Sequence, residues 1–354
     1  MGQKMTVNKS LSRVGVVILN YLNSADTIEC LESVMKSDYE NFAVMVVNNG
    51  GDKESSDDLA KWAFGVNTYD AVEGAMKKYS YPPYPKPLKL YKTAYDEDKG
   101  FSFISGEKGG IVLIETAVNK GYAAGNNAGI KYGLENENFD YFWILNNDTV
   151  AEPDAMRQLV SHAEKLKEKS IKTAMTGSKL YYYAAEKVLN GVNGIYNKWS
   201  GTGRLRGAFE KDLGQYDKGG FRIDYVSGAS MLVSTEFIKD AGFMYEGYFL
   251  FYEEMDWAER ARAKGYGLAF CPQSIVWHKE GASTGSSSKG SKNSVISEFY
   301  GLRNRIRFTR KNFPLFLPFA CAGFAGVILN RIIRGQSDRI PNVIKAFREG
   351  FKDE

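Results

Sequence analysis

Long apolar runs separated by amphipathic stretches dominate the first half of the chain. The apolar runs, rich in Val and Ile, cover residues 14–19, 42–47, 111–116 and 141–145. Uninterrupted runs of this length predict strands that are buried on both faces, as in a parallel sheet. Helical patterns cover residues 28–35, 124–134 and 154–169. Strands that alternate with helices predict an α/β fold with a mostly parallel central sheet.

The pattern is less regular in the second half. Residues 226–234 and 267–276 predict two more strands, and the strong helix formers of residues 253–264 predict a helix between them. Residues 181–220 are rich in Gly, Asn and Tyr and have weak periodicity. We expect short strands and loops there.

Two segments interrupt this order. Residues 62–110 contain a Pro-rich loop and a polar stretch, which we interpret as an insertion without chemistry of its own. The Ser, Gly and Lys residues of 283–294 indicate a linker or a lid. We therefore expect a main domain over residues 1–298, with one half at about 13–150 and the other at about 151–298.

Residues 299–354 have a different pattern, and we expect them to form a helical extension. Residues 312–330 contain no charged side chain but include Pro314 and Pro318. A membrane-spanning helix needs about 20 apolar residues. This run is slightly shorter, so an interfacial, re-entrant or buried hairpin segment fits it better. Residues 342–351 alternate apolar and basic side chains at helical spacing, as in a helix that lies on a membrane.

The composition is that of an ordinary globular protein. Apolar residues make up 44% and charged residues 25% of the 354 positions, which excludes a mostly disordered chain, collagen and a pure coiled coil. The length fits one large domain with an appendage. Cys30, Cys271 and Cys321 are too few and too far apart for a disulfide framework or a zinc site, which favours a reducing compartment. Residues 1–13 lack the apolar segment of a signal peptide.

The net charge of +4 is unevenly distributed. Residues 300–354 hold eleven Lys or Arg and four Asp or Glu, a net charge of +7, whereas residues 1–299 sum to −3. A basic tail on a mildly acidic body predicts an anionic partner, either a nucleic acid or a membrane surface. We expect an anionic membrane surface and no nucleic acid, because the basic residues of the tail surround a long apolar run.

Several catalytic motifs are absent from the sequence. It contains no P-loop lysine motif, no G-x-G-x-x-G, no H-E-x-x-H and no G-x-S-x-G. The chain has two histidines, His162 and His278. His162 falls in a polar helical pattern, so a Ser-His-Asp hydrolase would have to use His278.

Acidic side chains at two places indicate other chemistry. Asp148 follows an apolar strand, with Asn146 two residues before it. Oxygen ligands at a strand end suit a hard divalent cation that binds phosphates, although an Asn/Asp turn is equally compatible. Glu253, Glu254 and Asp256 open a predicted helix. Such a cluster is commonly solvated, but the aromatic residues before it favour a half-buried carboxylate with a raised pKa, suited to act as a base.

Eight short motifs occur in a characteristic order. They are VILNY at 17–21, VVNNG at 46–50, NKGYAAGNNAG at 119–129, LNNDT at 145–149, GA at 228–229, GF at 242–243, FYEEMDW at 251–257 and VWH at 276–278. With these motifs the chain resembles family 2 glycosyltransferases of the GT-A fold, especially the bacterial rhamnosyltransferase-like branch. The resemblance covers about residues 13–311. It implies a Rossmann-like sheet with flanking helices, a nucleotide-sugar half and an acceptor half, followed by a membrane-associating tail.

The resemblance implies a role for each matching position. The donor-binding positions would be Asn20, Tyr21, Asn48, Asn119, Gly121, Asn126, Asn146 and Asn147. The metal positions would be Asn146, Asp148 and His278, for Mn²⁺ or Mg²⁺. Two positions depart from the family pattern. Asn48 stands where the family usually has an Asp that binds the base, and Asn146 replaces the first Asp of the metal motif.

The catalytic base of the family aligns with Glu254, whose side chain is one methylene longer than the usual Asp. Asp256 is the competing candidate. We expect it to be structural, because Arg260 lies four residues later and forms a favourable helix pair with it. Glu253, Gly228 and Trp257 would lie on the acceptor side.

We therefore expect an inverting, metal-dependent glycosyltransferase that is cytoplasmic and peripheral on the inner face of the plasma membrane. It would move a sugar from a UDP- or dTDP-linked donor to a hydroxyl of a cell-surface glycan or a lipid-linked acceptor. A nucleotidyltransferase is an alternative, but it needs a Gly-rich, basic loop after the first strand, and residues 22–27 offer neither feature. An inactive sugar-binding homologue is a second alternative. Loss of the acidic residues would indicate it, yet Asp148, Glu254 and Asp256 are all present.

Overall fold

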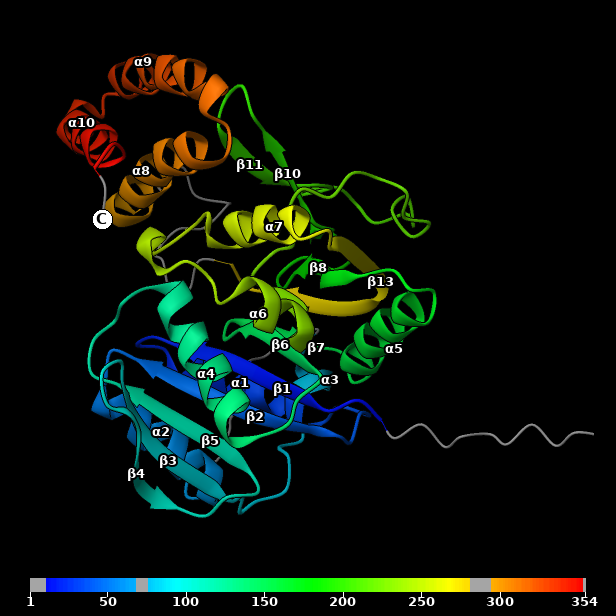
Figure 1. Ribbon diagram of the computed structural model, residues 1–354. Helices are drawn as coiled ribbons and strands as arrows, with labels where there is room; N and C mark the ends of the chain where they lie inside the picture. The colour runs from blue at the N-terminus through cyan, green and yellow to red at the C-terminus, as the bar shows by residue number, and fades with distance from the viewer. Residues whose placement is uncertain (1–10, 68–75, 281–293, 353–354) are drawn as a thin grey trace, which may run out of the picture.

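The computed structural model describes residues 11–67, 76–280 and 294–352. Within them, an eleven-stranded sheet forms the body of the molecule, and helices cover both of its faces (Figure 1). In their order across the sheet, the strands are β4 (Gly100–Gly106), β3 (Leu90–Asp96), β5 (Ile111–Thr116), β2 (Phe42–Asn49), β1 (Val14–Asn20), β6 (Tyr141–Asn146), β12 (Ser230–Ser234), β8 (Thr173–Tyr182), β13 (Gly267–His278) and β7 (Thr149–Ala151), with β9 (Leu189–Gly191) paired to β8.

The expected α/β architecture is confirmed. Strands β3, β5, β2, β1 and β6 pair in parallel, as do β8 and β13. Strand β12 is antiparallel to both of its neighbours, β6 and β8. The carboxyl ends of β1, β2, β5 and β6 therefore meet at one edge, which is where ligands bind in open α/β sheets.

Alternate side chains of β1 face two different helical layers, as the two-residue period of a strand requires. Val16 and Ile18 are buried against α1, α2 and α5, whereas Val17 belongs to the cluster formed with α4, α6 and α7. The helices of the body are α1 (Ser24–Met35), α2 (Lys53–Phe64), α3 (Lys77–Ser80), α4 (Tyr122–Asn136), α5 (Ala155–Glu168), α6 (Thr235–Ala241), the short η1 (Glu246–Tyr248) and α7 (Glu253–Ala263).

Three sequence-based expectations need correction. The segment 62–110 is not a separate insertion, because its strands β3 and β4 extend the central sheet beyond β5. Strand β8 was not expected, because buried Thr176, Ser178 and Lys179 interrupt its apolar pattern. Strand β12 begins at Ser230 rather than at residue 226. Of the expected linker or lid, residues 283–293 lie outside the described residues.

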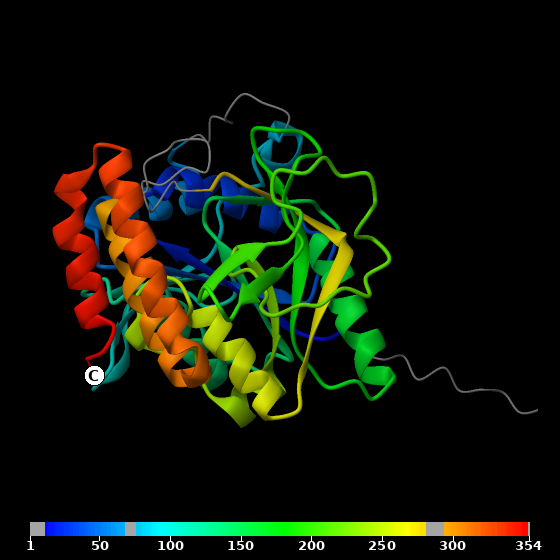
Figure 2. The same ribbon diagram turned by 90° about the horizontal axis from the view of Figure 1, so that it is seen from above.

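The C-terminal helices pack together on one side of the body, beside the hairpin of β10 (Gly194–Asn197) and β11 (Thr202–Leu205) (Figure 2). They are α8 (Val295–Asn312), η2 (Pro314–Phe316), α9 (Leu317–Ile333), η3 (Ser337–Arg339) and α10 (Ile340–Glu349). The boundary expected between residues 298 and 299 falls inside α8, so the chain passes from body to extension within one continuous helix.

Among the described residues, one helical segment, Pro314–Ile333, is long and apolar enough to cross a membrane, judged by its length and composition. The expectation that this run is too short is wrong, because the helix continues past residue 330 to Ile333. Its two prolines do not interrupt it either. Pro314 and Pro318 occupy the first turns of η2 and α9, where proline is tolerated because those N–H groups have no helical partner.

Candidate active site

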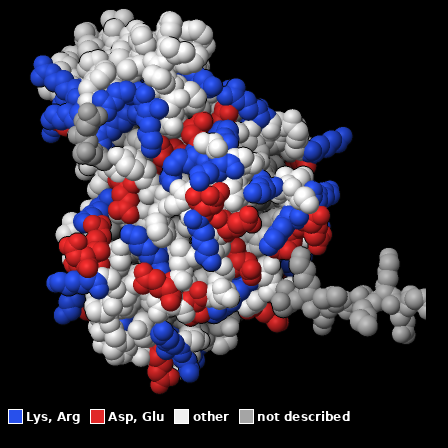
Figure 3. Space-filling view, in the orientation of Figure 1, with Lys and Arg blue, Asp and Glu red and all other residues white. Residues whose placement is uncertain are grey.

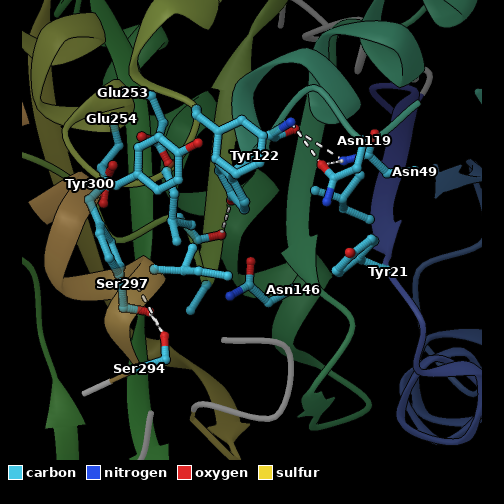
Figure 4. A pocket seen from close by; sticks show the side chains of 18 of the residues that line it. Tyr21, Asn49, Asn119, Tyr122, Asn146, Glu253, Glu254, Ser294, Ser297 and Tyr300 are labelled. Carbon is cyan, nitrogen blue, oxygen red and sulfur yellow. Dashed lines mark hydrogen bonds between the residues drawn. The ribbon is translucent and has the colours of Figure 1, made fainter. Parts of the chain in front are cut away.

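A cavity of about 890 Å³ opens at the carboxyl ends of β1, β2 and β6. Figure 4 shows Tyr21, Asn49 and Asn119 on one side of it and Glu253 and Glu254 on the other. The sequence-predicted residues that line it are Tyr21, Asn119, Gly121, Asn146, Asn147, Asp148, Gly228, Glu253, Glu254 and His278. The structure therefore brings most of the expected site residues to one place.

The loop before α4 is built around amide hydrogen bonds. Asn49 Nδ2 donates to Asn119 Oδ1 at 2.9 Å and to the carbonyl of Gly121 at 3.1 Å. Asn119 Oδ1 also accepts from the N–H of Gly121 at 2.8 Å. Gly121 has a φ of +97°, and a Cβ at this position would overlap the carbonyl of Phe249. Only glycine therefore allows this loop to approach the segment that precedes α7.

Three expected donor-binding residues do not line the cavity. Asn20 and Asn48 are paired across β1 and β2, and both are buried. Asn20 Nδ2 donates to Asn48 Oδ1 at 2.9 Å, and Asn20 Oδ1 accepts from the Thr27 hydroxyl at 2.8 Å. Asn48 Nδ2 donates to Glu115 and to the carbonyl of Asp52. Asn126, also fully buried, donates to the carbonyl of Tyr122. These amides support the cavity from behind.

Asp148 and His278 converge in the expected metal region. His278 Nε2 lies 3.2 Å from Asp148 Oδ1, and its Nδ1 lies 3.2 Å from Asn190 Oδ1, which fixes the orientation of the ring. Burial alone would raise the pKa of Asp148, but His278 and Lys279 outweigh it and lower that pKa. Burial lowers the pKa of His278, but the charge of Asp148 outweighs it and raises the pKa.

This pair fits a divalent cation that takes its other ligands from a diphosphate. No group of three His, Cys, Asp or Glu side chains with metal-binding geometry occurs within the described residues. Cations such as Mg²⁺ are commonly held by one or two carboxylates together with substrate phosphates, and an imidazole nitrogen suits Mn²⁺ as well. Asn146 also lines the cavity, at the end of β6.

Glu253 and Glu254 begin α7 and line the cavity from the other side. One carboxylate oxygen of each, Oε2, is buried and has no hydrogen-bond partner among the described residues. Burial raises the pKa of Glu254 to about 7. Burial, together with the charge of Glu254, raises the pKa of Glu253 well above its ordinary value. A carboxylate with a pKa near neutrality is a suitable general base.

Asp256 and Trp257 lie behind this wall and do not line the cavity. Asp256 is fully buried and forms ion pairs with Arg260 at 3.1 Å and with Lys311 at 2.7 Å. Trp257 is fully buried, and its Nε1 donates to the carbonyl of Gly242 at 2.9 Å. The acceptor-side position expected for Trp257 is therefore not supported, because its ring lies in the core.

The family is decided by residues 68–295, which match the model of the family described as glycosyltransferase-like family 2. The chain belongs to this family. It is therefore a glycosyltransferase, as the motifs and the fold indicate.

One curated relative of this glycosyltransferase is the low-salt glycan biosynthesis hexosyltransferase Agl10 of Haloferax volcanii. It is 25% identical over 167 residues, which are 46% of this chain and 49% of the relative. The chain thus matches about half the length of that protein.

Two solved structures share the fold of this glycosyltransferase. The mannosyltransferase PcManGT of Pyrobaculum calidifontis, solved with GDP-Man and Mn²⁺, has a TM-score of 0.53 and 11% identity, over 98% of this chain and 89% of its own. GalNAc-T7, solved with UDP, GalNAc and Mn²⁺, has a TM-score of 0.51 and 14% identity, over 86% of this chain and 48% of its own. These likenesses support the GT-A fold.

The sequence did not indicate that the C-terminal helices of the glycosyltransferase would contribute to the cavity. Its lining also includes Ser294, Val295, Ile296, Ser297, Phe299 and Tyr300 from the start of α8, and Asn342 and Lys345 from α10. The aromatic and basic residues at the start of α8 were the one sequence feature that could have indicated this contribution. Their spacing does not show which part of the body α8 contacts.

Proposed function

We propose that this glycosyltransferase is inverting and metal-dependent, and that it transfers a sugar from a UDP- or dTDP-linked donor to a hydroxyl of a lipid-linked or cell-surface glycan. The observation that carries the proposal is the position of Glu254. Its half-buried carboxylate, with a pKa of about 7, faces the same cavity as Tyr21, Asn49 and Asn119 at the strand ends. A base and a donor-binding edge are what a single displacement requires.

In the proposed reaction, Glu254 accepts the proton of the acceptor hydroxyl. The hydroxyl oxygen attacks the anomeric carbon from the side opposite the nucleotide diphosphate, and the bond to the diphosphate breaks with its electron pair leaving on the phosphate oxygen. One displacement of this kind inverts the anomeric configuration. A divalent cation held by Asp148 and His278 would neutralise the charge of the leaving diphosphate. The loop of Gly121 would hold the donor in place.

Two observations support an acceptor that is anchored in a membrane. The cavity wall near α8 is apolar, formed by Leu250, Phe251, Val295, Ile296 and Phe299. The outer face of η2 and α9 is uncharged and solvent-exposed, with Lys and Arg side chains beside it (Figure 3).

This face includes large exposed side chains at Leu315, Phe319, Leu329, Ile332 and Ile333. Trp199 of the neighbouring hairpin is in ring contact with Phe316 and Phe319 and is 60% exposed. We propose that this face binds the cytoplasmic surface of an anionic membrane, with the net charge of +7 in residues 300–354 attracting the headgroups.

The test is a transfer assay with UDP-, dTDP- and GDP-sugars, lipid-linked and free glycan acceptors, and either Mn²⁺ or Mg²⁺. We expect nucleotide release coupled to transfer, with inversion seen by NMR of the first product. Retention of configuration would contradict the mechanism. Turnover of none of the donors, or pyrophosphate release from a nucleoside triphosphate and a sugar phosphate, would contradict the proposed function.

A further inference from the structure

The segment that leads into α7 has an unusual backbone. Phe249, Phe251 and Tyr252 all have positive φ, at +65°, +68° and +76°. Bulky side chains rarely adopt this conformation, and they keep it only where the surrounding structure holds it. Glu253 and Glu254 follow directly. The direction in which these carboxylates point therefore depends on whatever stabilises this segment.

Asn304 of α8 supplies three hydrogen bonds to it. Its Nδ2 donates to the carbonyls of Tyr248, Leu250 and Phe251 at 2.9, 2.8 and 3.0 Å. Its Oδ1 accepts from Arg303 Nε at 2.9 Å, which sets the orientation of the amide. Asn304 is fully buried. An uncharged side chain that donates from one end and accepts at the other is the chemistry this position requires.

Neighbouring residues of α8 strengthen the same attachment. Arg303 donates to the carbonyls of Gly247 and Tyr248 at 2.9 and 2.7 Å. Arg307 donates to the carbonyl of Gly247 at 3.0 Å. The ring of Tyr300 stacks on that of Phe249, with centroids 4.5 Å apart and planes 17° from parallel. One face of α8 therefore holds almost every carbonyl of the segment before α7.

We infer that Asn304 is a positioning residue for sugar transfer, which fixes the segment 248–251 so that Glu254 points into the cavity. This inference rests on the proposed function, because it takes Glu254 as the base. Asn304 itself does not line the cavity. It acts through the backbone, so its loss should mainly impair the chemical step. The segment also contacts the donor loop, because the carbonyl of Phe249 accepts from the N–H of Tyr122 at 2.7 Å. The hydrogen bonds among Asn49, Asn119 and Gly121 that build the donor-binding edge do not involve the segment and should remain.

The experiment compares Asn304→Ala with Asn312→Ala. Asn312 is a matched control on the same helix, because its Nδ2 donates to a backbone carbonyl of that helix, that of Phe308, at 3.2 Å. We expect Asn304→Ala to lower kcat about 10²-fold, the scale of a misplaced reacting group, with the KM for the donor changed less than threefold. Asn312→Ala should keep the wild-type kcat. Melting temperature and nucleotide binding, measured for both variants, show whether each is folded.

A pH profile separates positioning from a general loss of structure. If the freed segment lets water reach Glu254, its pKa falls, and the rising limb of kcat should move to lower pH in Asn304→Ala. Among the described residues, the titratable groups that interact with Glu254 are Glu253 and the hydroxyls of Tyr122, Tyr225 and Tyr252, and the substitution removes none of them.

A second variant covers the case in which Asn304→Ala does not fold. Arg307 is partly exposed, and Arg307→Lys removes the guanidinium group that donates to the carbonyl of Gly247. We expect this variant to have a smaller loss of kcat, with the donor KM unchanged. An unchanged kcat in whichever of the two variants folds would overturn the inference, as would a donor KM that rises as much as kcat falls. Inactive wild-type protein, or a fully active Glu254→Gln, would instead overturn the proposed function.

Discussion

Lys311, near the end of α8, forms a 2.7 Å ion pair with the buried carboxylate of Asp256 on α7. The same carboxylate is paired with Arg260, four residues later on its own helix. Within the part of the chain that the structure describes, Glu254 forms no ion pair, and its Oε2 is buried without a hydrogen bond. Two acidic residues that are two positions apart thus have different surroundings. One joins the C-terminal extension to the body, and the other faces the cavity.

This difference predicts different outcomes for two isosteric substitutions. Glu254→Gln should bind donor and metal normally but lose transfer by about 10²- to 10⁴-fold, the usual contribution of a general base. Asp256→Asn should mainly lower stability, by about 1.5–3 kcal/mol, because it weakens the hydrogen bonds of a buried carboxylate to two partly exposed cations. Steady-state kinetics and chemical denaturation measure the two effects.

Glu253→Gln is the control on the neighbouring position and should have a milder effect than Glu254→Gln. A near wild-type rate for Glu254→Gln, together with a folded but inactive Asp256→Asn that still binds donor, would identify Asp256 as the base.

The raised pKa of Glu254 predicts two pH dependences. The base must be deprotonated, so kcat should rise with pH and level off above about 7. The folding stability depends on pH in the opposite direction. The folded protein holds this proton up to about pH 7, whereas the unfolded chain releases it near 4.3. The stabilising contribution is therefore complete at low pH and lost as pH rises toward 7. The melting temperature of wild type relative to Glu254→Gln should fall between pH 5 and 7.5, and a constant difference would contradict the assignment.

The sequence predicts the central strands well, because β1, β2, β5 and β6 are uninterrupted apolar runs between helices. It does not predict β8, where burial of Ser178 and Lys179 depends on hydrogen bonds and an ion pair from distant parts of the chain. Serine, threonine and lysine give no apolar periodicity, whatever their final burial.

Prediction of the candidate site from the sequence has the same limit. Asn48 and Asn49 are both polar residues at a strand end, but successive side chains of a strand point to opposite faces. Asn49 reaches the cavity and Asn48 does not. The role of Asn304 was beyond sequence reasoning, because no periodicity in α8 indicates that its partners are carbonyl groups more than 50 residues earlier.

Gly121→Ala should separate the donor loop from the rest of the site. The new Cβ would overlap the carbonyl of Phe249, so the loop must move. We expect kcat/KM to fall on the order of 10²-fold, mostly through the KM for the donor. Gly219→Ala is the control, because Gly219 also has a positive φ but open space around it. It should cost about 1 kcal/mol of stability and leave the kinetics unchanged. Equal kinetic effects in the two variants would contradict this role of the loop.

Metal-dependent transfer is predicted to require Asp148 and to be strengthened by His278. Asp148→Ala should abolish transfer, and His278→Ala should raise the Mn²⁺ concentration needed for half-maximal rate. His162→Ala is the matched control, because His162 lies on α5 and does not line the cavity. Isothermal titration with Mn²⁺ and a nucleoside diphosphate gives a second measurement that does not depend on turnover. Full activity of Asp148→Ala in EDTA would contradict the prediction.

Membrane binding is predicted to depend on the exposed face of η2 and α9. Leu315 and Ile333 are 86% and 74% exposed there, and burying an exposed aliphatic side chain contributes about 1.5–3 kcal/mol. The double variant Leu315→Ser/Ile333→Ser should therefore bind anionic vesicles at least about tenfold more weakly. Leu213→Ser/Val66→Ser changes two residues of similar exposure, 78% and 71%, outside the C-terminal helices, and should bind normally.

Vesicle flotation distinguishes a peripheral protein from one that spans the bilayer. Peripheral binding through basic residues weakens as salt screens their attraction to the headgroups, and alkaline carbonate should release the protein.

The segment Pro314–Ile333 is nevertheless long enough to cross a membrane. Carbonate-resistant binding that neither salt nor the double variant reduces would mean that α9 crosses the bilayer. In that case α9 would have to leave its contacts with α8 and α10, so the cavity wall that includes Lys345 would also change. A fall in transfer on detergent extraction would accompany that outcome, whereas a peripheral enzyme should stay active.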